Sequence, residues 1–281
     1  MLNFNGKLIN QSEFLMTSNN RAFKYGDAIF ETLNIHNNTI VFWEDHYFRL
    51  MASMRILRME IPMSFTLEFL EAEILELIES KNQAQSTVRV KLMVSRKEGG
   101  LYAPVTNDVD YLITTKPLDS DFYEFNEIEY RVDLYKDHYI SPSLLSTLKS
   151  NNRLINVIGN IYAKENGLNN CLLLNTDKSV VEALNANIFL VKDDIIKTPP
   201  LSDGCIKGVL RKQIIDIINL IPEFTLEEAS ISPFELQKAD ELFLTNTIAG
   251  IQPISSYRKK KFRTDGSKNI LAKLNVKVRL S

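Results

Sequence analysis

The sequence contains few cysteines and few histidines. Its 281 residues include two cysteines, Cys171 and Cys205, each flanked by apolar residues and without the spacing of metal ligands. A disulfide framework is thereby excluded, and the composition fits a reducing compartment. The three histidines offer little material for a histidine metal centre or a Ser-His-Asp triad. We therefore expect a protein without a bound metal.

Signals for membrane insertion and export are also missing. No apolar run reaches about 18 residues, the length that a transmembrane helix needs. The N-terminal residues MLNFNGKLINQSEF contain no basic segment followed by an apolar one, which a signal peptide would require. These absences predict a cytoplasmic protein with no membrane partner.

Charge of one sign is lacking as well. The chain has 33 Lys and Arg residues against 35 Asp and Glu residues, a formal net charge of -2. Bulk binding of nucleic acid needs a cationic face, so no nucleic-acid partner is expected. The basic run 258–261 is an exception, and its aromatic neighbours favour an exposed turn between two strands. With 44% hydrophobic and 24% charged residues, the chain is globular rather than disordered.

Hydrophobic periodicity predicts the elements of the first 115 residues. Asn5-Gly6 predicts the tight turn of a hairpin over residues 1–9. Apolar residues three and four apart predict two helices, the second with Thr66 as its N-cap. The expected strands are 28–35, 39–43, 87–95 and 111–115, and the expected helices are 44–57 and 66–80.

A short polar segment with one proline, residues 116–122, is the best candidate for a linker. It divides the chain into an N-terminal domain of residues 1–115 and a C-terminal domain of residues 123–281. In the second domain the expected strands are 128–134, 171–175, 187–191, 241–245 and 250–255, and the expected helices are 152–166 and 209–219. This order predicts an α+β architecture in both halves, with a strand-rich second half.

Familiar catalytic motifs are absent, but three residues are suited to catalysis or binding. The chain has no G-x-G-x-x-G, G-x-x-x-x-G-K-[ST], H-E-x-x-H or G-x-S-x-G. Lys149 precedes a helix and could act covalently if its amine loses a proton. Glu182 interrupts an apolar stretch and needs a cationic or hydrogen-bonding partner. Gly208 precedes a helix start whose free N–H groups could bind phosphate. Taken singly, each has a structural alternative: a surface lysine, a half-exposed carboxylate and a simple turn.

Together the motifs of the chain resemble the class IV aminotransferase family, the pyridoxal-phosphate (PLP) enzymes of fold type IV. The motifs are LKSNNRL at 148–154, VVEALNANIF at 180–189, TPPLSDGCIKGVLR at 198–211 and DELFLTNT at 240–247, supported by YGDAIFET at 25–32 and HYFRL at 46–50. The family includes branched-chain and D-amino-acid aminotransferases and aminodeoxychorismate lyases. The resemblance implies a smaller N-terminal α/β domain, a larger strand-rich PLP-binding domain and a homodimer.

The resemblance also implies a role for each matched residue. Lys149 matches the lysine that holds PLP as an internal aldimine and moves the substrate proton. Glu182 matches the carboxylate that pairs with the pyridine nitrogen. The phosphate contacts fall on the Arg49 side chain, the backbone of Val209 and Leu210, and the Thr247 hydroxyl, and Asn187 is expected to support the loop. Two positions depart from the family: Leu210 where many members carry threonine, and the bulky Leu184 where small residues are common.

The implied activity is the transfer of an amino group between an amino acid, branched-chain-like or of D configuration, and a 2-oxo acid. The alternative is a 4-amino-4-deoxychorismate lyase that releases p-aminobenzoate and pyruvate. Phe30 fits branched-chain enzymes and lyases, and Tyr25 lies in a segment closer to branched-chain enzymes. Residues 95–104 resemble the lyase loop, although Leu101 stands where lyases carry an arginine. Arg96 or Arg153 is a candidate for binding a substrate carboxylate, with support of the fold or surface charge as the alternative for each.

Two other classes of protein would lack this chemistry: a scaffold protein of the same fold and a nucleotide-binding module. A scaffold protein of the same fold would have lost Lys149 or Glu182, and both are present. A nucleotide-binding module would carry one of the glycine-rich motifs, and none occurs. The sequence therefore favours an enzyme.

Overall fold

The computed structural model describes residues 1–119, 123–125 and 128–280. They form two compact units. The first comprises residues 1–119 together with 149–152, and the second comprises the rest of the described chain. The short segment 149–152 thus belongs to the first unit, although the residues on both sides of it belong to the second.

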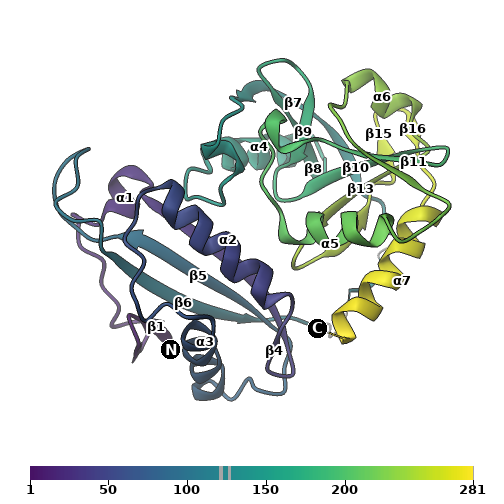
Figure 1. Ribbon diagram of the computed structural model, residues 1–281. Helices are drawn as coiled ribbons and strands as arrows, with labels where there is room; N and C mark the ends of the chain where they lie inside the picture. The colour runs from purple at the N-terminus through teal and green to yellow at the C-terminus, as the bar shows by residue number, and fades with distance from the viewer. Residues whose placement is uncertain (120–122, 126–127, 281) are drawn as a thin grey trace. The chain divides into compact units, whose positions relative to one another are not determined.

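The first unit is built on one six-stranded antiparallel sheet with the strand order β2-β1-β6-β5-β3-β4 (Figure 1). Its strands are β1 (Leu2–Phe4), β2 (Lys7–Ile9), β3 (Ala28–His36), β4 (Thr39–Ile40), β5 (Val88–Arg96) and β6 (Val109–Pro117). Its helices are α1 (Arg21–Tyr25), α2 (Trp43–Ile56) and α3 (Leu67–Ser80).

Helices α2 and α3 cover one face of this sheet. Alternate strand residues such as Leu33 and Leu92 are buried there with Met54 of α2 and Ile74 of α3 in a single core. Because side chains alternate across a strand, the residues in between lie on the opposite face. We call this opposite face the polar face; it carries Phe30 and Thr32 of β3 and Arg89, Lys91 and Met93 of β5.

The second unit contains two five-stranded sheets, ordered β12-β11-β10-β13-β14 and β16-β15-β7-β8-β9 (Figure 1). Side chains of both sheets share one apolar core, in which Leu172 and Val180 pack with Ile188 and Leu244. The strands are β7 (Arg131–Ile140), β8 (Asn170–Asn175), β9 (Val180–Ala183), β10 (Asn187–Lys192), β11 (Ile195–Thr198), β12 (Thr225–Glu228), β13 (Glu241–Asn246), β14 (Gly250–Pro253), β15 (Ser256–Tyr257) and β16 (Lys260–Lys261). The helices are α4 (Leu154–Glu165), α5 (Val209–Ile218), α6 (Pro233–Lys238) and α7 (Asp265–Arg279), with 3-10 turns at Leu145–Thr147 and Leu201–Asp203.

Most predicted elements are confirmed, and so is the α+β class. The hairpin turns at Asn5 and Gly6, whose φ angles of 51° and 79° suit a tight two-residue turn. Thr66 caps α3 by accepting a hydrogen bond from the backbone N–H of Phe69 at 3.1 Å. The first half of the basic run, Arg258 and Lys259, forms the predicted turn between β15 and β16, whereas Lys260 and Lys261 make up β16 itself.

Two expectations were wrong, and one helix was not predicted. The strand 39–43 ends at Ile40, because Trp43 already begins α2. The linker does not begin at Lys116, since Lys116 and Pro117 are the last residues of β6; positions 120–122 lie outside the described residues. Helix α7 was not predicted, although Ile270 and Leu274 show helical spacing and are fully buried.

Candidate active site

Lys149 is held by the edge of the sheet in the first unit. The N–H of Phe30 donates to the carbonyl of Lys149 at 2.9 Å, and the N–H of Asn151 donates to the carbonyl of Ala28 at 2.9 Å. Ser150 forms an antiparallel bridge with Ile29 between these two bonds. The segment 149–151 therefore pairs with β3 as a short extra strand at the sheet edge. This pairing fixes the backbone from which the lysine side chain projects.

The side chain of Lys149 lies on the polar face. Its Nζ is 4.7 Å from the centroid of the Phe30 ring, within the range of a cation–π contact. Asn151, two residues on and on the same side, has its amide nitrogen 3.7 Å from the sulfur of Met93. The structure thus brings together two residues that the sequence predicted separately, Lys149 as the catalyst and Phe30 as a substrate contact.

Arg49 belongs to a buried network on the helix-covered side of the same sheet. Its Nε donates to Oε1 of Glu31 at 2.8 Å, and its Nη2 makes a short ion pair with Oε2. Nδ1 of His46 lies 2.7 Å from Oε2 of the same carboxylate. Glu31 and His46 are 1% and 0% exposed, so water does not screen this network. The guanidinium of Arg49 is therefore oriented by Glu31, and its role in phosphate binding stays a prediction.

The pKa shifts of Glu31 and His46 determine which residues of this network are charged at neutral pH. Burial by itself would raise the pKa of Glu31, but the charge of Arg49 and the hydrogen bonds from His46 and Arg49 outweigh it and lower the pKa to about 2. Burial lowers the pKa of His46, and the cations Arg49 and Lys149 act in the same direction against Glu31. At neutral pH the carboxylate accepts and the neutral imidazole donates its Nδ1–H. The sequence reasoning missed both residues, although each lies inside a quoted motif.

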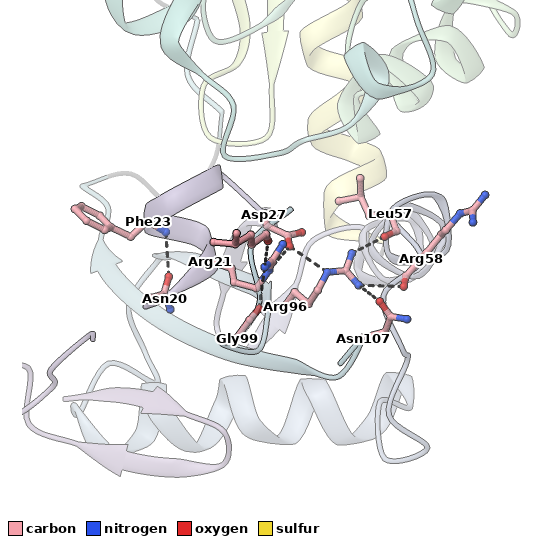
Figure 2. Close-up of polar contacts among 10 residues, drawn as sticks. Asn20, Arg21, Phe23, Asp27, Leu57, Arg58, Arg96, Gly99 and Asn107 are labelled. Carbon is pink, nitrogen blue, oxygen red and sulfur yellow. Dashed lines mark hydrogen bonds and ion pairs between the residues drawn. The ribbon is translucent and has the colours of Figure 1, made fainter. Parts of the chain in front are cut away.

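Arg96, predicted as a candidate for the substrate carboxylate, is engaged inside the protein (Figure 2). Its Nε donates to Asp27 at 3.0 Å, Nη1 to the carbonyl of Arg58 and to Asn107 at 3.1 and 2.5 Å, and Nη2 to the carbonyl of Leu57 at 2.6 Å. Four of the five N–H donors of a guanidinium are thereby used. The geometry favours the alternative expected for Arg96, support of the fold.

A second arginine shares the same carboxylate. Arg21 donates to Asp27 at 2.8 Å and to the carbonyls of Gly99 and Leu101 at 3.0 and 2.7 Å (Figure 2). Its guanidinium carbon also lies 5.0 Å from the centroid of the Tyr25 ring. Tyr25, a predicted substrate residue, is therefore held beside the glycine-containing loop that resembles the lyase loop.

In the second unit, Glu182 is buried in β9 and accepts a hydrogen bond from a backbone amide. Its Oε2 lies 2.9 Å from the N–H of Ile206, and the residue is 3% exposed. The half-exposed alternative for this residue is wrong. The carbonyl of Ile206 in turn accepts from the side-chain amide of Asn187 at 2.9 Å. The backbone of Ile206 therefore links Glu182 to Asn187, at the start of the segment that leads into α5.

The N-terminus of α5 lies at this same place. Gly208 is its N-cap and supplies no side-chain cap, so the first N–H groups of the helix are available to an anion. A Cβ at Gly208 would come within 2.1 Å of Oδ1 of Asn187, which explains the glycine. The side chains of Val209 and Leu210 are 5% and 2% exposed. Their backbone N–H groups are therefore what this helix start offers to an anion.

Thr247 follows β13 in a turn next to this helix start. Asn187 on β10 pairs with Thr245 on β13, which brings the DELFLTNT motif to the same place. The hydroxyl of Thr245 is buried and, within the described chain, has no hydrogen-bond partner. The carbonyl of Thr247 accepts from the hydroxyl of Tyr123 at 2.7 Å, which fixes the turn. The predicted second-unit residues are thus gathered around the start of α5.

Other reactive groups carry no comparable arrangement. Cys171 and Cys205 are buried free thiols, and burial raises their pKa values to about 11 and about 12, so neither is a thiolate at neutral pH. Across the described ranges, no group of three or more His, Cys, Asp or Glu residues could hold a metal ion. No helix in the described part of the chain combines the length and the apolar character that a membrane span requires.

Comparison with known proteins gives one family. The family model described as amino-transferase class IV matches residues 28–257. A branched-chain-amino-acid aminotransferase of Escherichia coli (strain K12) is 25% identical over 263 residues, which cover 90% of this chain and 83% of that protein. A D-alanine aminotransferase of Bacillus licheniformis is 25% identical, with 90% and 87% covered, and an aminodeoxychorismate lyase of Vibrio harveyi is 24% identical, with 84% of each covered.

A solved structure has the same fold. The branched-chain aminotransferase of the archaeon Thermoproteus uzoniensis superposes with a TM-score of 0.87 at 23% identity, covering 99% of this chain and 94% of that one. At this identity the likeness establishes the fold alone. That fold contains the elements that carry Lys149, Glu182 and the start of α5.

Proposed function

This chain belongs to the class IV aminotransferase family, and we propose on that premise that it transfers an amino group between an amino acid and a 2-oxo acid with pyridoxal 5'-phosphate as cofactor. The donor would be a branched-chain-like or a D-amino acid, the classes handled by relatives with 25% identity. The observation that carries the proposal is the backbone of Lys149, paired with β3 so that its amine stands beside Phe30.

The chemical groups of the chain fit this cofactor. A protonated pyridine nitrogen needs a buried anion, and Glu182 is a buried carboxylate. A phosphate needs N–H donors, and the uncapped start of α5 offers those of Val209 and Leu210. An aldehyde needs an amine, which Lys149 provides. The orphaned hydroxyl of Thr245, next to the Thr247 turn, adds a donor without a protein partner in the described chain.

Each of these residues would have a defined role in binding the cofactor or in moving a proton. PLP, when bound, supplies an electron sink for the negative charge that forms on the substrate α-carbon. Lys149 would hold the cofactor through Nζ and, once released, would take the proton from the substrate α-carbon and deliver it to the C4′ carbon of the cofactor, as amino transfer requires. Glu182 would keep the ring nitrogen protonated. Arg49, oriented by Glu31, and the amides of Val209 and Leu210 would bind the phosphate.

A 4-amino-4-deoxychorismate lyase is the second candidate. An aminodeoxychorismate lyase is 24% identical over 84% of the chain, which is close to the identity of the aminotransferases. Gly99 and Gly100 have φ angles of 116° and 73°, so the loop that resembles the lyase loop adopts a conformation that glycine allows. Against it, Leu101 is 73% exposed and offers no cation for a substrate carboxylate.

A spectral assay distinguishes these functions. The protein loaded with PLP is mixed in turn with L-amino acids, D-amino acids and aminodeoxychorismate while its visible spectrum is recorded. Transamination predicts that one amino acid removes the band of the lysine-bound cofactor and that a 2-oxo acid restores it. Release of p-aminobenzoate and pyruvate from aminodeoxychorismate alone would establish the lyase instead.

The same assay tests the residue assignment. Lys149→Ala is expected to abolish both the band and turnover, because the substitution removes the amine that would hold the cofactor. Lys164→Ala, an exposed lysine of α4, is the matched control and should behave as the unaltered protein. Normal turnover by the Lys149 variant would contradict the assignment.

We also propose that the chain forms a homodimer and acts in the cytoplasm. Leu154, Val157 and Ile161 follow one side of α4 and are 70%, 54% and 52% exposed. An apolar stripe of this kind is typical of a surface that another chain covers. Sedimentation at working concentration tests the assembly, and a monomeric mass would refute it.

A further inference from the structure

A three-residue loop joins β13 to β14 and carries Thr247, one of the residues predicted to bind the cofactor phosphate. The loop lies between Asn246 and Gly250, which pair across the two strands. Gly250 has a φ angle of 69°, in the left-handed region that often closes a loop of this length. The side-chain oxygen of Asn246 accepts from the N–H groups of Ile248 and Ala249 at 3.0 and 2.8 Å. The loop is therefore braced from inside by its own first strand.

Tyr123 holds the same loop from outside the two strands. Its hydroxyl donates to the carbonyl of Thr247 at 2.7 Å, and the residue is 6% exposed. Its ring is so close to Gly250 that a Cβ there would come within 2.5 Å of the ring carbon Cγ. The carbonyl of Tyr123 accepts from the side-chain amide of Asn275 in α7 at 2.9 Å. Tyr123, the first described residue of the second unit, therefore has a fixed position against the loop.

The strand that leads into this loop has a polar side chain beside the start of α5. Thr245 of β13 lies opposite Asn187 of β10 in the register, so both side chains are on one face of the sheet. The side chain of Asn187 lies against Gly208, the N-cap of α5. The hydroxyl of Thr245 is buried and has no hydrogen-bond partner in the part of the chain that the structure describes. A buried hydroxyl of this kind beside an uncapped helix start favours a bound anion there.

We propose that Tyr123 is a positioning residue for the phosphate of PLP. By fixing the carbonyl of Thr247, it would hold the hydroxyl of the same residue in the direction that a phosphate needs. Tyr123 would not donate to the cofactor itself, because its one O–H is used by the carbonyl. A donor that is oriented beforehand binds more tightly, since less freedom is lost on binding. The proposal rests on the proposed function, because it takes the loop and the start of α5 as the phosphate site.

Two forms of the cofactor separate this role from general support of the fold. Calorimetry on the protein freed of cofactor compares PLP with pyridoxal, which has the same ring and aldehyde but no phosphate. Tyr123→Phe keeps the ring against Gly250 and removes the hydrogen bond to Thr247. We expect it to weaken PLP binding about fivefold, the change that one ordinary hydrogen bond produces, and to leave pyridoxal binding unchanged.

Tyr130→Phe is the matched control. The Tyr130 hydroxyl accepts from the side-chain amide of Asn170 at 3.0 Å, and Asn170 belongs to the other sheet of the second unit. The variant therefore loses a comparable hydrogen bond outside the loop. It should bind both compounds as the unaltered protein does.

A double-mutant cycle tests the route through Thr247. Thr247→Val keeps the shape of the side chain but removes its hydroxyl, so it should weaken binding of PLP and not of pyridoxal. In that variant, Tyr123→Phe should cause little further loss, because the group that Tyr123 positions is already gone. Losses of PLP affinity that simply multiply would overturn the route.

The outcomes for the two proposals are distinct. Equal weakening of PLP and pyridoxal binding in Tyr123→Phe, or no change in either, would overturn the positioning role. Tighter binding of PLP than of pyridoxal that depends on Tyr123, in a protein that transaminates no amino acid, would overturn the proposed function and leave the positioning role standing. Circular dichroism of each variant checks that the fold is retained.

Discussion

Replacing Glu31 by glutamine tests the buried network that orients Arg49. The substitution keeps the shape of the side chain but removes the negative charge that Arg49 and His46 contact. The pKa of Glu31 falls from an ordinary 4.5 to about 2 in the folded chain. Each pKa unit corresponds to about 1.4 kcal/mol, so the ionised carboxylate contributes roughly 3 kcal/mol to the free energy of unfolding at neutral pH.

The pH dependence of this contribution has a definite sign. A carboxyl group whose pKa is lowered by folding stabilises the protein above its unfolded pKa, and the contribution disappears as the pH falls through the folded value. The difference in unfolding free energy between the unaltered chain and Glu31→Gln should therefore be constant above about pH 5 and shrink between pH 4.5 and 2. His46 and Arg49 remain in both proteins, so the difference isolates the carboxylate.

The chain contains a convenient reporter for this measurement. Trp43, its single tryptophan, begins α2 in the same unit as Glu31 and is 7% exposed. Urea unfolding followed by tryptophan fluorescence at several pH values gives the unfolding free energy of that unit. Glu79→Gln, an exposed carboxylate of α3, is the control and should change stability by less than about 0.5 kcal/mol.

The reasoning would be refuted by a loss below about 1 kcal/mol in Glu31→Gln at neutral pH. It would also fail if the loss stayed the same from pH 7 to pH 3, because a network held by an ionised carboxylate must weaken when that carboxylate is protonated. The affinity for PLP can also be measured on the variant after the cofactor has been removed. A lower affinity would show that Glu31 supports cofactor binding through Arg49.

Two further substitutions probe the supports of the Lys149 segment. Gly26→Ala should lower stability and turnover more than Gly167→Ala, because both glycines have φ +64° but only a Cβ at Gly26 meets another residue, Oδ1 of Asn152 at 2.5 Å. Equal effects in thermal unfolding and activity would show that backbone strain alone matters. Arg96→Met should cost about 3–5 kcal/mol in the fluorescence-detected unfolding of the first unit, because it removes the buried guanidinium that donates to Asp27 and to three other acceptors. A cost near that of a surface substitution would show that Arg96 is not a structural support.

Local sequence patterns were sufficient for much of the secondary structure. Asn5-Gly6 specifies its turn through backbone conformations that few other pairs adopt, and Thr66 specifies a helix start through its own side chain. Where several signals compete, the local pattern is weaker: Trp43 suits a strand by propensity but begins α2. Burial of one apolar side of α7 against the second unit outweighs the modest helix signal of that segment.

Motifs in the sequence identified the residues of the candidate site, but not the side chains that hold those residues in place. Lys149, Glu182 and the start of α5 could be named from the sequence because a family pattern matches them. Glu31 and His46 lie in the same motifs, yet their importance comes from a distance of 2.7 Å between residues of β3 and α2. Arg96 illustrates the reverse case, since its role depends on four acceptors that come from separate stretches of the chain.

The sequence by itself determined the α+β class, the family and the chemical types at the candidate site, because these depend on short motifs and on the periodicity of neighbouring residues. Only the tertiary structure decided that Lys149 joins the sheet of the first unit and that Arg96 holds the fold together. Those facts depend on strand pairing between residues up to about 120 positions apart. Such pairing is set by the burial of whole faces rather than by any local signal.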